Sequence, residues 1–124
     1  MTSTARELPV VSSWISGRSD AAGERFGDVY DPATGEVARR VAFASAADVD
    51  RAVAAAREAF AEWGSASLAR RTEVMFRFRE LMAARSGELA AIITSEHGKT
   101  LDDAAGEVQR GLEVVEFACG IAHL

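Results

Sequence analysis

Residues 93–108 read ITSEHGKTLDDAAGEV, and the boundary between two helices in this stretch decides the fold class. Gly98, Lys99 and Thr100 also match the last three residues of a phosphate-binding loop, which would place a nucleotide-binding strand and helix here. Such a loop requires a second glycine five residues before Gly98, where this chain has Ile93. We therefore predict a helix junction, in which Gly98 ends one helix in a left-handed conformation and Thr100 caps the next.

Helical periodicity continues upstream of this junction as far as Ser45. Serine caps, repeated apolar residues and glycines divide the chain from there on into four expected helices, at residues 46–62, 68–84, 87–97 and 101–122. The serines expected at the first three N-termini are Ser45, Ser67 and Ser86. The apolar stripes include Val49, Val53 and Phe60 in the first helix, and Val74, Phe78 and Leu81, with Met75 and Met82 beside them, in the second.

The N-terminal third of the chain has strand patterns instead. VVSSWISG (10–17) and RFGDVYDPATGEVARRVAFAS (25–45) are rich in β-branched and aromatic residues. The second segment is interrupted by Asp31-Pro32-Ala33-Thr34-Gly35, an order typical of a turn, so we predict an antiparallel hairpin with Gly35 at a positive φ angle. The expected fold class is α+β: an N-terminal β-hairpin near residues 11–43 followed by four helices, after a loose arm over residues 1–10.

The last expected helix has two apolar stripes. At about 100° of rotation per residue, Val114, Phe117 and Ile121 fall within about 40° of Arg110. The other stripe lies on the opposite side and consists of Val108, Leu112, Val115 and Cys119. A helix that is apolar on both sides is normally covered on both, and the preceding helices suffice for only one side. We therefore expect this chain to be part of a larger protein or an obligate partner in an assembly.

Composition and charge exclude several function classes. The 124 residues are 48% hydrophobic and 27% charged, which is ordinary for a globular domain. The net charge is −5 without a basic run, which argues against nucleic acid as a partner. No apolar run approaches the roughly 18 residues of a membrane span, and the N-terminus lacks a signal-peptide core. The single cysteine excludes an internal disulfide and fits the reducing cytoplasm.

Few residues have the pattern of catalytic groups. Cys119 falls late in a helix on an apolar stripe, so we expect a buried apolar side chain rather than a reactive thiolate. His97 and His123 lack a recognisable acidic partner, and Lys99, the sole lysine, is expected to be a solvated charge at the helix junction. The sequence contains no Cys-x-x-Cys or His-x-x-x-His pair, so we expect no metal site.

Arg110 differs because it heads the stripe of Val114 and Phe117, close to the small residue Gly106. An arginine in that position either extends into solvent or binds an anion. Glu107 and Glu113 lie three residues away on either side, so an ordinary surface ion pair is the simpler interpretation of the spacing. The residues alone leave both interpretations open.

Several motifs resemble the beginning of the aldehyde dehydrogenase superfamily. They are WISG (14–17), VYDPATGEVARRV (29–41), DVDRAVAAAREAFAEW (48–63), the arginine of LARR (68–71), EHGKT (96–100) and GEV (106–108). The stretch GEVQRGLEVVEFACG (106–120) is the most specific, and is similar to the CoA-acylating methylmalonate-semialdehyde dehydrogenases. Ser16 is a small departure, because Asn, Asp or Gly is commoner before that glycine.

The resemblance implies a larger α/β parent enzyme, of which residues 11–124 are the N-terminal portion. Its catalytic cysteine and its cofactor-binding core would lie downstream, so this segment would hold neither catalytic nor cofactor-binding residues. The parent would use NAD and coenzyme A to convert malonate or methylmalonate semialdehyde to acetyl-CoA or propionyl-CoA with release of CO2, as in valine and inositol catabolism. The parent would be a homo-oligomer, a dimer or tetramer, and Arg110 would bind the substrate carboxylate.

Two functions remain at this point. The first is the N-terminal segment of such a dehydrogenase, inactive alone. The second is a truncated, non-catalytic interaction module that binds a partner through the exposed apolar face of the last helix. A reading frame that continues past Leu124 into a cysteine motif and a dinucleotide-binding segment favours the enzyme, and a stop codon favours the module.

Overall fold

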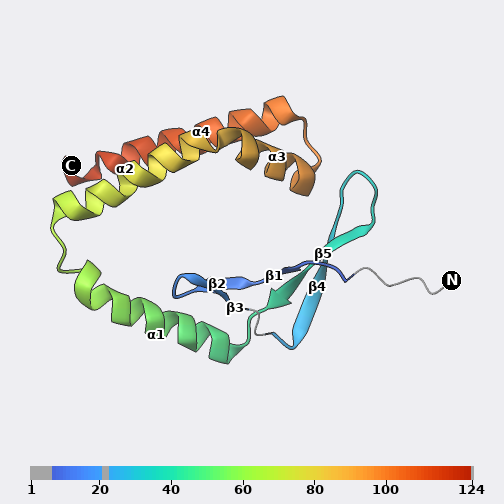
Figure 1. Cartoon of the computed structure of the whole chain (residues 1–124), viewed down its shortest axis with the longest axis horizontal. Coiled ribbons are helices and arrows are strands. Elements are labelled where there is room, and N and C mark those ends of the chain that lie inside the picture. The colour runs from blue at the N-terminus through green and yellow to red at the C-terminus, as the bar shows by residue number, and fades with distance from the viewer. Residues whose placement is uncertain (1–6, 21–22, 124) are drawn as a thin grey trace. The chain divides into compact units, whose positions relative to one another are not determined.

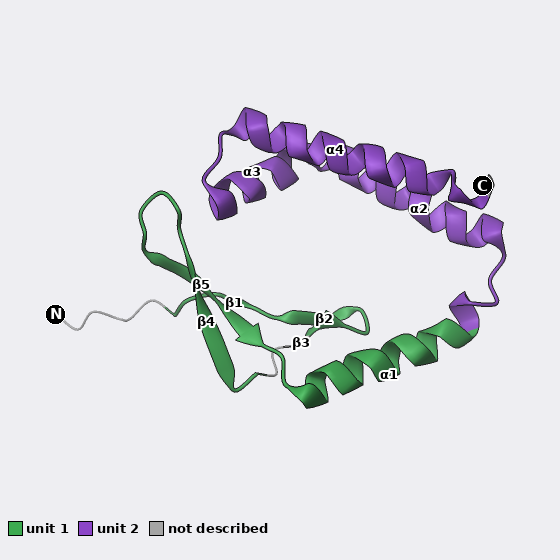
Figure 2. Ribbon diagram, turned by 180° about the vertical axis from the view of Figure 1, so that it is seen from behind, with its two compact units in different colours: residues 1–61 green, residues 62–124 purple. Residues whose placement is uncertain are grey.

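The computed structural model describes residues 7–20 and 23–123, which belong to two compact units. Within these residues, the first unit (residues 1–61) contains five strands and most of helix α1, as Figures 1 and 2 show. The second unit (residues 62–124) contains helices α2, α3 and α4 and a short 3-10 helix, η1. The expected α+β class is confirmed, and residues 50–95, all of them described, contain no strand.

The strands of the first unit form two small sheets. One has the order β1-β5-β4, where β1 spans Val10–Val11, β4 spans Arg25–Tyr30 and β5 spans Val37–Phe43. The other pairs β2 (Ser13–Ile15) with β3 (Arg18–Asp20). The predicted antiparallel hairpin of β4 and β5 is confirmed, whereas the parallel pairing of β1 with β5 was not predicted. The expected arm lies mostly outside the described residues, and its last residue, Val10, pairs with Arg40 in β5.

Two turns join these strands. Gly35 has the predicted positive φ, 75°, and its N–H donates to the Asp31 carbonyl at 2.8 Å. The turn between β2 and β3 has positive φ at both central residues, 54° at Ser16 and 76° at Gly17. Two successive positive φ angles define a type I′ hairpin turn, where Asn, Asp and Gly are favoured. Ser16, the departure from the family pattern, therefore occupies a conformation that serine adopts at some cost.

The helices closely match the predicted ranges. The structure has α1 at Ala46–Trp63, α2 at Leu68–Ala84, α3 at Ser86–His97, α4 at Leu101–Cys119 and η1 at Ile121–His123. The last helix ends three residues earlier than predicted, because the Gly120 N–H bonds back to the carbonyls of Phe117 and Ala118. Ser86 is not a cap as expected, since it is the first residue of α3 and Arg85 holds the N-cap position without a side-chain bond.

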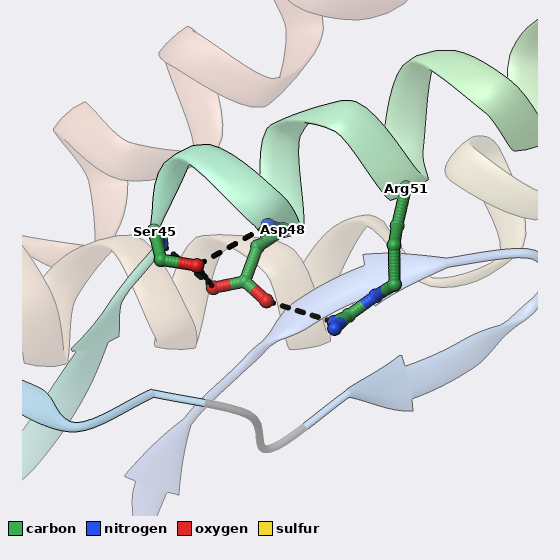
Figure 3. Close-up of polar contacts among 3 residues, drawn as sticks. All are labelled: Ser45, Asp48 and Arg51. Atoms are coloured by element: carbon green, nitrogen blue, oxygen red, sulfur yellow. Dashed lines mark hydrogen bonds and ion pairs between the residues drawn. The ribbon is translucent and has the colours of Figure 1, made fainter.

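The start of α1 is held by a reciprocal cap, shown in Figure 3. The Asp48 N–H donates to Ser45 Oγ at 3.2 Å, and the Ser45 N–H donates to Asp48 Oδ2 at 2.7 Å. Arg51 Nη2 lies 2.9 Å from Asp48 Oδ1 and completes the cluster. These bonds, above all those from Ser45, lower the pKa of Asp48 from its ordinary value, although burial opposes the shift. The predicted cap at Ser45 is confirmed.

The apolar stripes expected in α1 and α2 are largely exposed within the described residues. In α1, Val49, Val53 and Phe60 are exposed. In α2, the exposed side includes Val74, Phe78 and Leu81, while Met75 and Met82 are half-buried. The other side of α2 contacts α4. Met82 Cε lies close to Gly111, 3.8 Å from where a Cβ on that glycine would be. Arg79 forms an ion pair with Glu116 at 2.6 Å. Contacts with α4, rather than hydrophobicity alone, select the side of α2 that packs.

The core of the second unit lies between α3 and α4. It consists of the buried residues Ala90, Ala104 and Val108, against which Leu89 and Ile93 pack. Small residues at these positions bring the two helices close together. This packing determines which side of α4 is buried, and therefore which of its side chains face solvent.

Candidate functional site

The junction between α3 and α4 has the predicted geometry. Gly98 has φ 81°, in the left-handed region, and its N–H donates to the Thr94 carbonyl at 2.8 Å. Thr100 Oγ1 accepts a hydrogen bond from the Asp103 N–H at 3.2 Å and so caps α4. The groups that a phosphate loop would present are therefore used to end one helix and begin another. Gly98-Lys99-Thr100 does not fit the phosphates of NAD or of another nucleotide.

Lys99 is not the solvated charge that was predicted. Its Nζ donates to Glu107 Oε1 in α4, and the Lys99 side chain is only 19% exposed. The hydrogen bond from Lys99 lowers the pKa of Glu107 below its ordinary value of 4.5. The charges of Lys99, Arg110 and His97 add to that shift, whereas partial burial opposes it. Glu107 is thus an ionised acceptor among three basic side chains.

The Arg110 side chain runs back along α4 towards the N-terminus, the direction that helical side chains favour. A Cβ placed on Gly106, one turn earlier, would lie 3.9 Å from Arg110 Nη1. Within the described residues Arg110 makes no hydrogen bond and no ion pair within 4 Å, because Glu107 pairs with Lys99 and Glu113 accepts from Gln109 Nε2 at 3.4 Å. Neither glutamate therefore bonds directly to Arg110, although the charge of Arg110 helps to lower the pKa of Glu107.

The two sides of α4 differ sharply in burial. Its inner face packs in the second unit and consists of Ala104, Val108, Leu112 and Cys119, all at most 8% exposed. Its outer face consists of Arg110, Val114 and Phe117, of which the two apolar residues are each 68% exposed. Ile121, in η1, is 61% exposed and extends the same stripe. The predicted two-sided pattern is confirmed, with one side covered and the other uncovered.

The other residues singled out from the sequence lie in the helices of the second unit. Cys119 is buried on the inner face, as predicted. His97 lies in the last turn of α3, and His123 is the last residue of η1. Within residues 7–20 and 23–123, no three His, Cys, Asp or Glu side chains are close enough to hold a metal ion. None of the helices in this part of the chain combines the length and apolarity of a membrane span.

The outer face presents the cation of Arg110 beside exposed apolar side chains. A guanidinium forms two parallel hydrogen bonds with a carboxylate, and the apolar side chains beside it favour a ligand with a short hydrocarbon part. Sequence reasoning found Arg110 but missed the Lys99–Glu107 pair. Lys99 directly precedes the Thr100 cap and Glu107 lies in the second turn of α4, so the conformation of the junction decides whether the two side chains meet.

Two buried polar atoms also escaped the sequence analysis. Arg71 Nε and Thr94 Oγ1 have no hydrogen-bond partner within the part of the chain that the structure describes. Arg71 is the last arginine of the LARR motif. Buried polar atoms in complete proteins usually have a hydrogen-bond partner. The second unit therefore has two buried polar atoms, Arg71 Nε and Thr94 Oγ1, that lack one within the described residues.

The sequence profile of the aldehyde dehydrogenase family matches residues 18–124. The malonate-semialdehyde dehydrogenase of Lacticaseibacillus casei is 42% identical over 125 residues, which are 100% of this chain and 25% of that protein. Malonate-semialdehyde dehydrogenase 3 of Geobacillus kaustophilus is 50% identical over 96 residues, 77% of this chain and 20% of that protein.

Solved structures of the same family are also similar to this chain. The methylmalonate-semialdehyde dehydrogenase of Oceanimonas doudoroffii aligns with a TM-score of 0.90 at 39% identity, over 94% of this chain and 24% of that one. A Sinorhizobium meliloti protein, assigned as a methylmalonate-semialdehyde dehydrogenase and crystallised with NAD, aligns with a TM-score of 0.89 at 40% identity, over 96% of this chain and 24% of that one. This chain thus spans about a quarter of the length of the relatives it matches. It belongs to the aldehyde dehydrogenase family and aligns with the N-terminal part of that fold.

Proposed function

We propose that this chain is the N-terminal segment of an NAD-dependent, CoA-acylating dehydrogenase for malonate or methylmalonate semialdehyde. In the net reaction, the semialdehyde, coenzyme A and NAD+ give acetyl-CoA or propionyl-CoA, CO2 and NADH, with the aldehyde hydrogen transferred as hydride. The names of the relatives and the NAD in one aligned structure support this class of substrate and cofactor. The parent enzyme would be cytoplasmic and a dimer or tetramer of identical subunits.

We assign to Arg110 the role of binding the substrate carboxylate. The observation that carries this assignment is that Arg110 has no acidic partner within the described residues, although two glutamates lie three residues away. These semialdehydes carry an acid group near the aldehyde, so a site for them needs a fixed cation. A helix holds such a cation in a fixed position. Phe117 would contact the apolar part of the substrate.

The segment by itself should not catalyse the reaction. Thioester formation needs a thiolate, a base and a bound nicotinamide, and the only thiol of this chain is buried on the inner face. We expect the purified 124-residue chain neither to reduce NAD with semialdehyde nor to bind NAD in a calorimetric titration. Turnover by this chain, at a rate proportional to its concentration, would refute the proposal that the reactive groups lie elsewhere.

The role of Arg110 is tested by Arg110→Leu in a complete enzyme that carries this segment. Losing a carboxylate contact in a partly dry site costs on the order of 2–4 kcal/mol, because the carboxylate is left unpaired. We therefore expect kcat/KM for methylmalonate semialdehyde to fall roughly a hundredfold, while propanal, which has no carboxylate, is hardly affected.

A matched control for this experiment is Arg77→Leu. Arg77 is also an exposed helical arginine, and it pairs with Glu73 at 2.5 Å in α2. The control should leave both substrates unchanged. Equal losses on methylmalonate semialdehyde and propanal in Arg110→Leu would mean that Arg110 is structural.

One observation also favours the interaction module, namely the exposure of Val114 and Phe117. A patch of this kind binds a partner or leads to self-association when it is uncovered. The two functions differ in what Phe117→Glu should do to the isolated chain. If the outer face serves only as a docking surface, this substitution should abolish partner binding, and no enzyme carrying the segment should depend on Arg110 for its substrate choice.

A further inference from the structure

The unpaired state of Arg110 needs an explanation, because Glu107 is well placed to neutralise it. The two residues are three apart in α4, the spacing at which opposite charges meet on a helix surface. The charge of Arg110 already lowers the pKa of Glu107, so the groups are close enough to interact. Nevertheless, the Glu107 carboxylate is hydrogen-bonded to Lys99 and not to Arg110.

The position of Lys99 accounts for that preference. Lys99 lies between Gly98, which ends α3, and Thr100, which caps α4, so its backbone is held on both sides. Its side chain is 19% exposed, whereas that of Glu107 is 39% exposed. A sparsely hydrated ammonium on a fixed backbone competes better for a carboxylate than a solvated guanidinium does, since it loses less freedom and less water on pairing.

We propose that Lys99 is a positioning residue for substrate binding: it holds the carboxylate of Glu107 at the α3–α4 junction and thereby keeps the guanidinium of Arg110 available for the carboxylate of the substrate. This inference rests on the proposed role of Arg110. It gives the Gly98-Lys99-Thr100 sequence, which does not fit a phosphate, a function in substrate choice.

A direct contact between Lys99 and the substrate is the competing account. It fits the structure less well, because the ammonium is already bonded to Glu107 and is mostly buried. A third account is that Lys99 and Glu107 act only through their charges at a distance. The three accounts predict different results for the two single variants and their combination.

The experiment is a double-mutant cycle with Lys99→Met and Glu107→Gln in a complete enzyme that carries this segment. In Lys99→Met, the released Glu107 should pair with Arg110 and raise KM for methylmalonate semialdehyde roughly three- to fivefold, the range of an exposed ion pair. Glu107→Gln alone should change KM little, since its carboxylate does not contact Arg110. The double variant should return to the KM of the wild-type enzyme, and propanal should respond to none of the three.

Other outcomes would overturn the proposal in distinct ways. If the double variant keeps the raised KM of Lys99→Met, then Lys99 itself contacts the substrate. If Glu107→Gln lowers KM by the factor by which Lys99→Met raises it, the effects add and only charge matters. If propanal is impaired as strongly as methylmalonate semialdehyde in Lys99→Met, the residue supports the fold and not substrate choice.

A second measurement on the 124-residue chain does not depend on any activity. The NMR resonance of the Arg110 Nε–H group should shift in Lys99→Met, where Glu107 becomes its partner, and should return in the double variant. Unchanged Nε–H resonances in Lys99→Met would refute the positioning role. If they shift as expected but Arg110→Leu impairs both substrates equally in the complete enzyme, the positioning is real and only the proposed substrate role of Arg110 fails.

Discussion

The inner and outer faces of α4 are both apolar stripes on one helix, yet they have opposite surroundings. Leu112 on the inner face is 8% exposed, whereas Val114, two residues later on the outer face, is 68% exposed. Hydrophobicity gives both residues the same tendency to leave water. The comparison shows that an apolar pattern indicates a surface that needs covering, while only the contacts of the fold determine which surface this chain covers by itself.

The strongest test of this comparison is a pair of truncations. Leu112→Ala should destabilise the chain by about 2–4 kcal/mol, because it removes buried methyl groups and leaves a cavity between helices. Val114→Ala should change the free energy of unfolding by less than about 0.5 kcal/mol, as surface substitutions usually do. Urea unfolding followed by circular dichroism measures both. Equal losses would mean that the outer face is covered in solution, by self-association or by a rearrangement.

The orientation of the two faces depends on where α4 begins. Thr100→Ala should cost about 1 kcal/mol, since the hydroxyl of Thr100 accepts the hydrogen bond that caps the helix. Ser86→Ala is the matched control and should be nearly neutral, because Ser86 makes no cap for α3. The same urea titration compares them, and a larger loss in Ser86→Ala than in Thr100→Ala would contradict the observed capping.

The smallest expected effect concerns pH. The folded-state pKa of Glu107 lies below its ordinary value of 4.5, so its ion pair contributes stability that is present above pH 4.5 and is lost as pH falls through the lowered pKa. We therefore expect the stability difference between wild type and Lys99→Met to shrink as the pH falls below 4.5. The deficit of Leu112→Ala, on the apolar inner face, should stay constant over the same range. A Lys99→Met difference that does not depend on pH would contradict the pairing.

Local signals were predicted well from sequence. The left-handed Gly98, the caps at Ser45 and Thr100, and the hairpin turn at Gly35 all occur as expected, and α2 begins beside Ser67 as expected. Each depends on one residue type and its immediate neighbours, so the sequence contains the whole cause. The end of α4 could have been predicted in the same way, because Gly120 is a visible stop signal.

Features that depend on distant contacts were missed. The parallel pairing of β1 with β5 joins residues about 30 apart in the chain, and no local pattern predicts it. The packing side of α2 could not be read from hydrophobicity either, because its apolar stripe of Val74, Phe78 and Leu81 is exposed. In the candidate site, Arg110 was identified from its stripe and the family motif, whereas the partners of Glu107 and Lys99 were not.

The sequence by itself determined the order of the elements, the junction at Gly98-Lys99-Thr100, the two-sided character of α4 and the family to which the motifs point. Those properties follow from backbone preferences and helical periodicity, which act over a few residues. Only the tertiary structure decided which face of α4 is buried and that Lys99 pairs with Glu107, so that Arg110 has no acidic partner within the described residues. Such contacts depend on how α3 lies against α4, since a difference of a few ångströms decides which of two cations a carboxylate reaches.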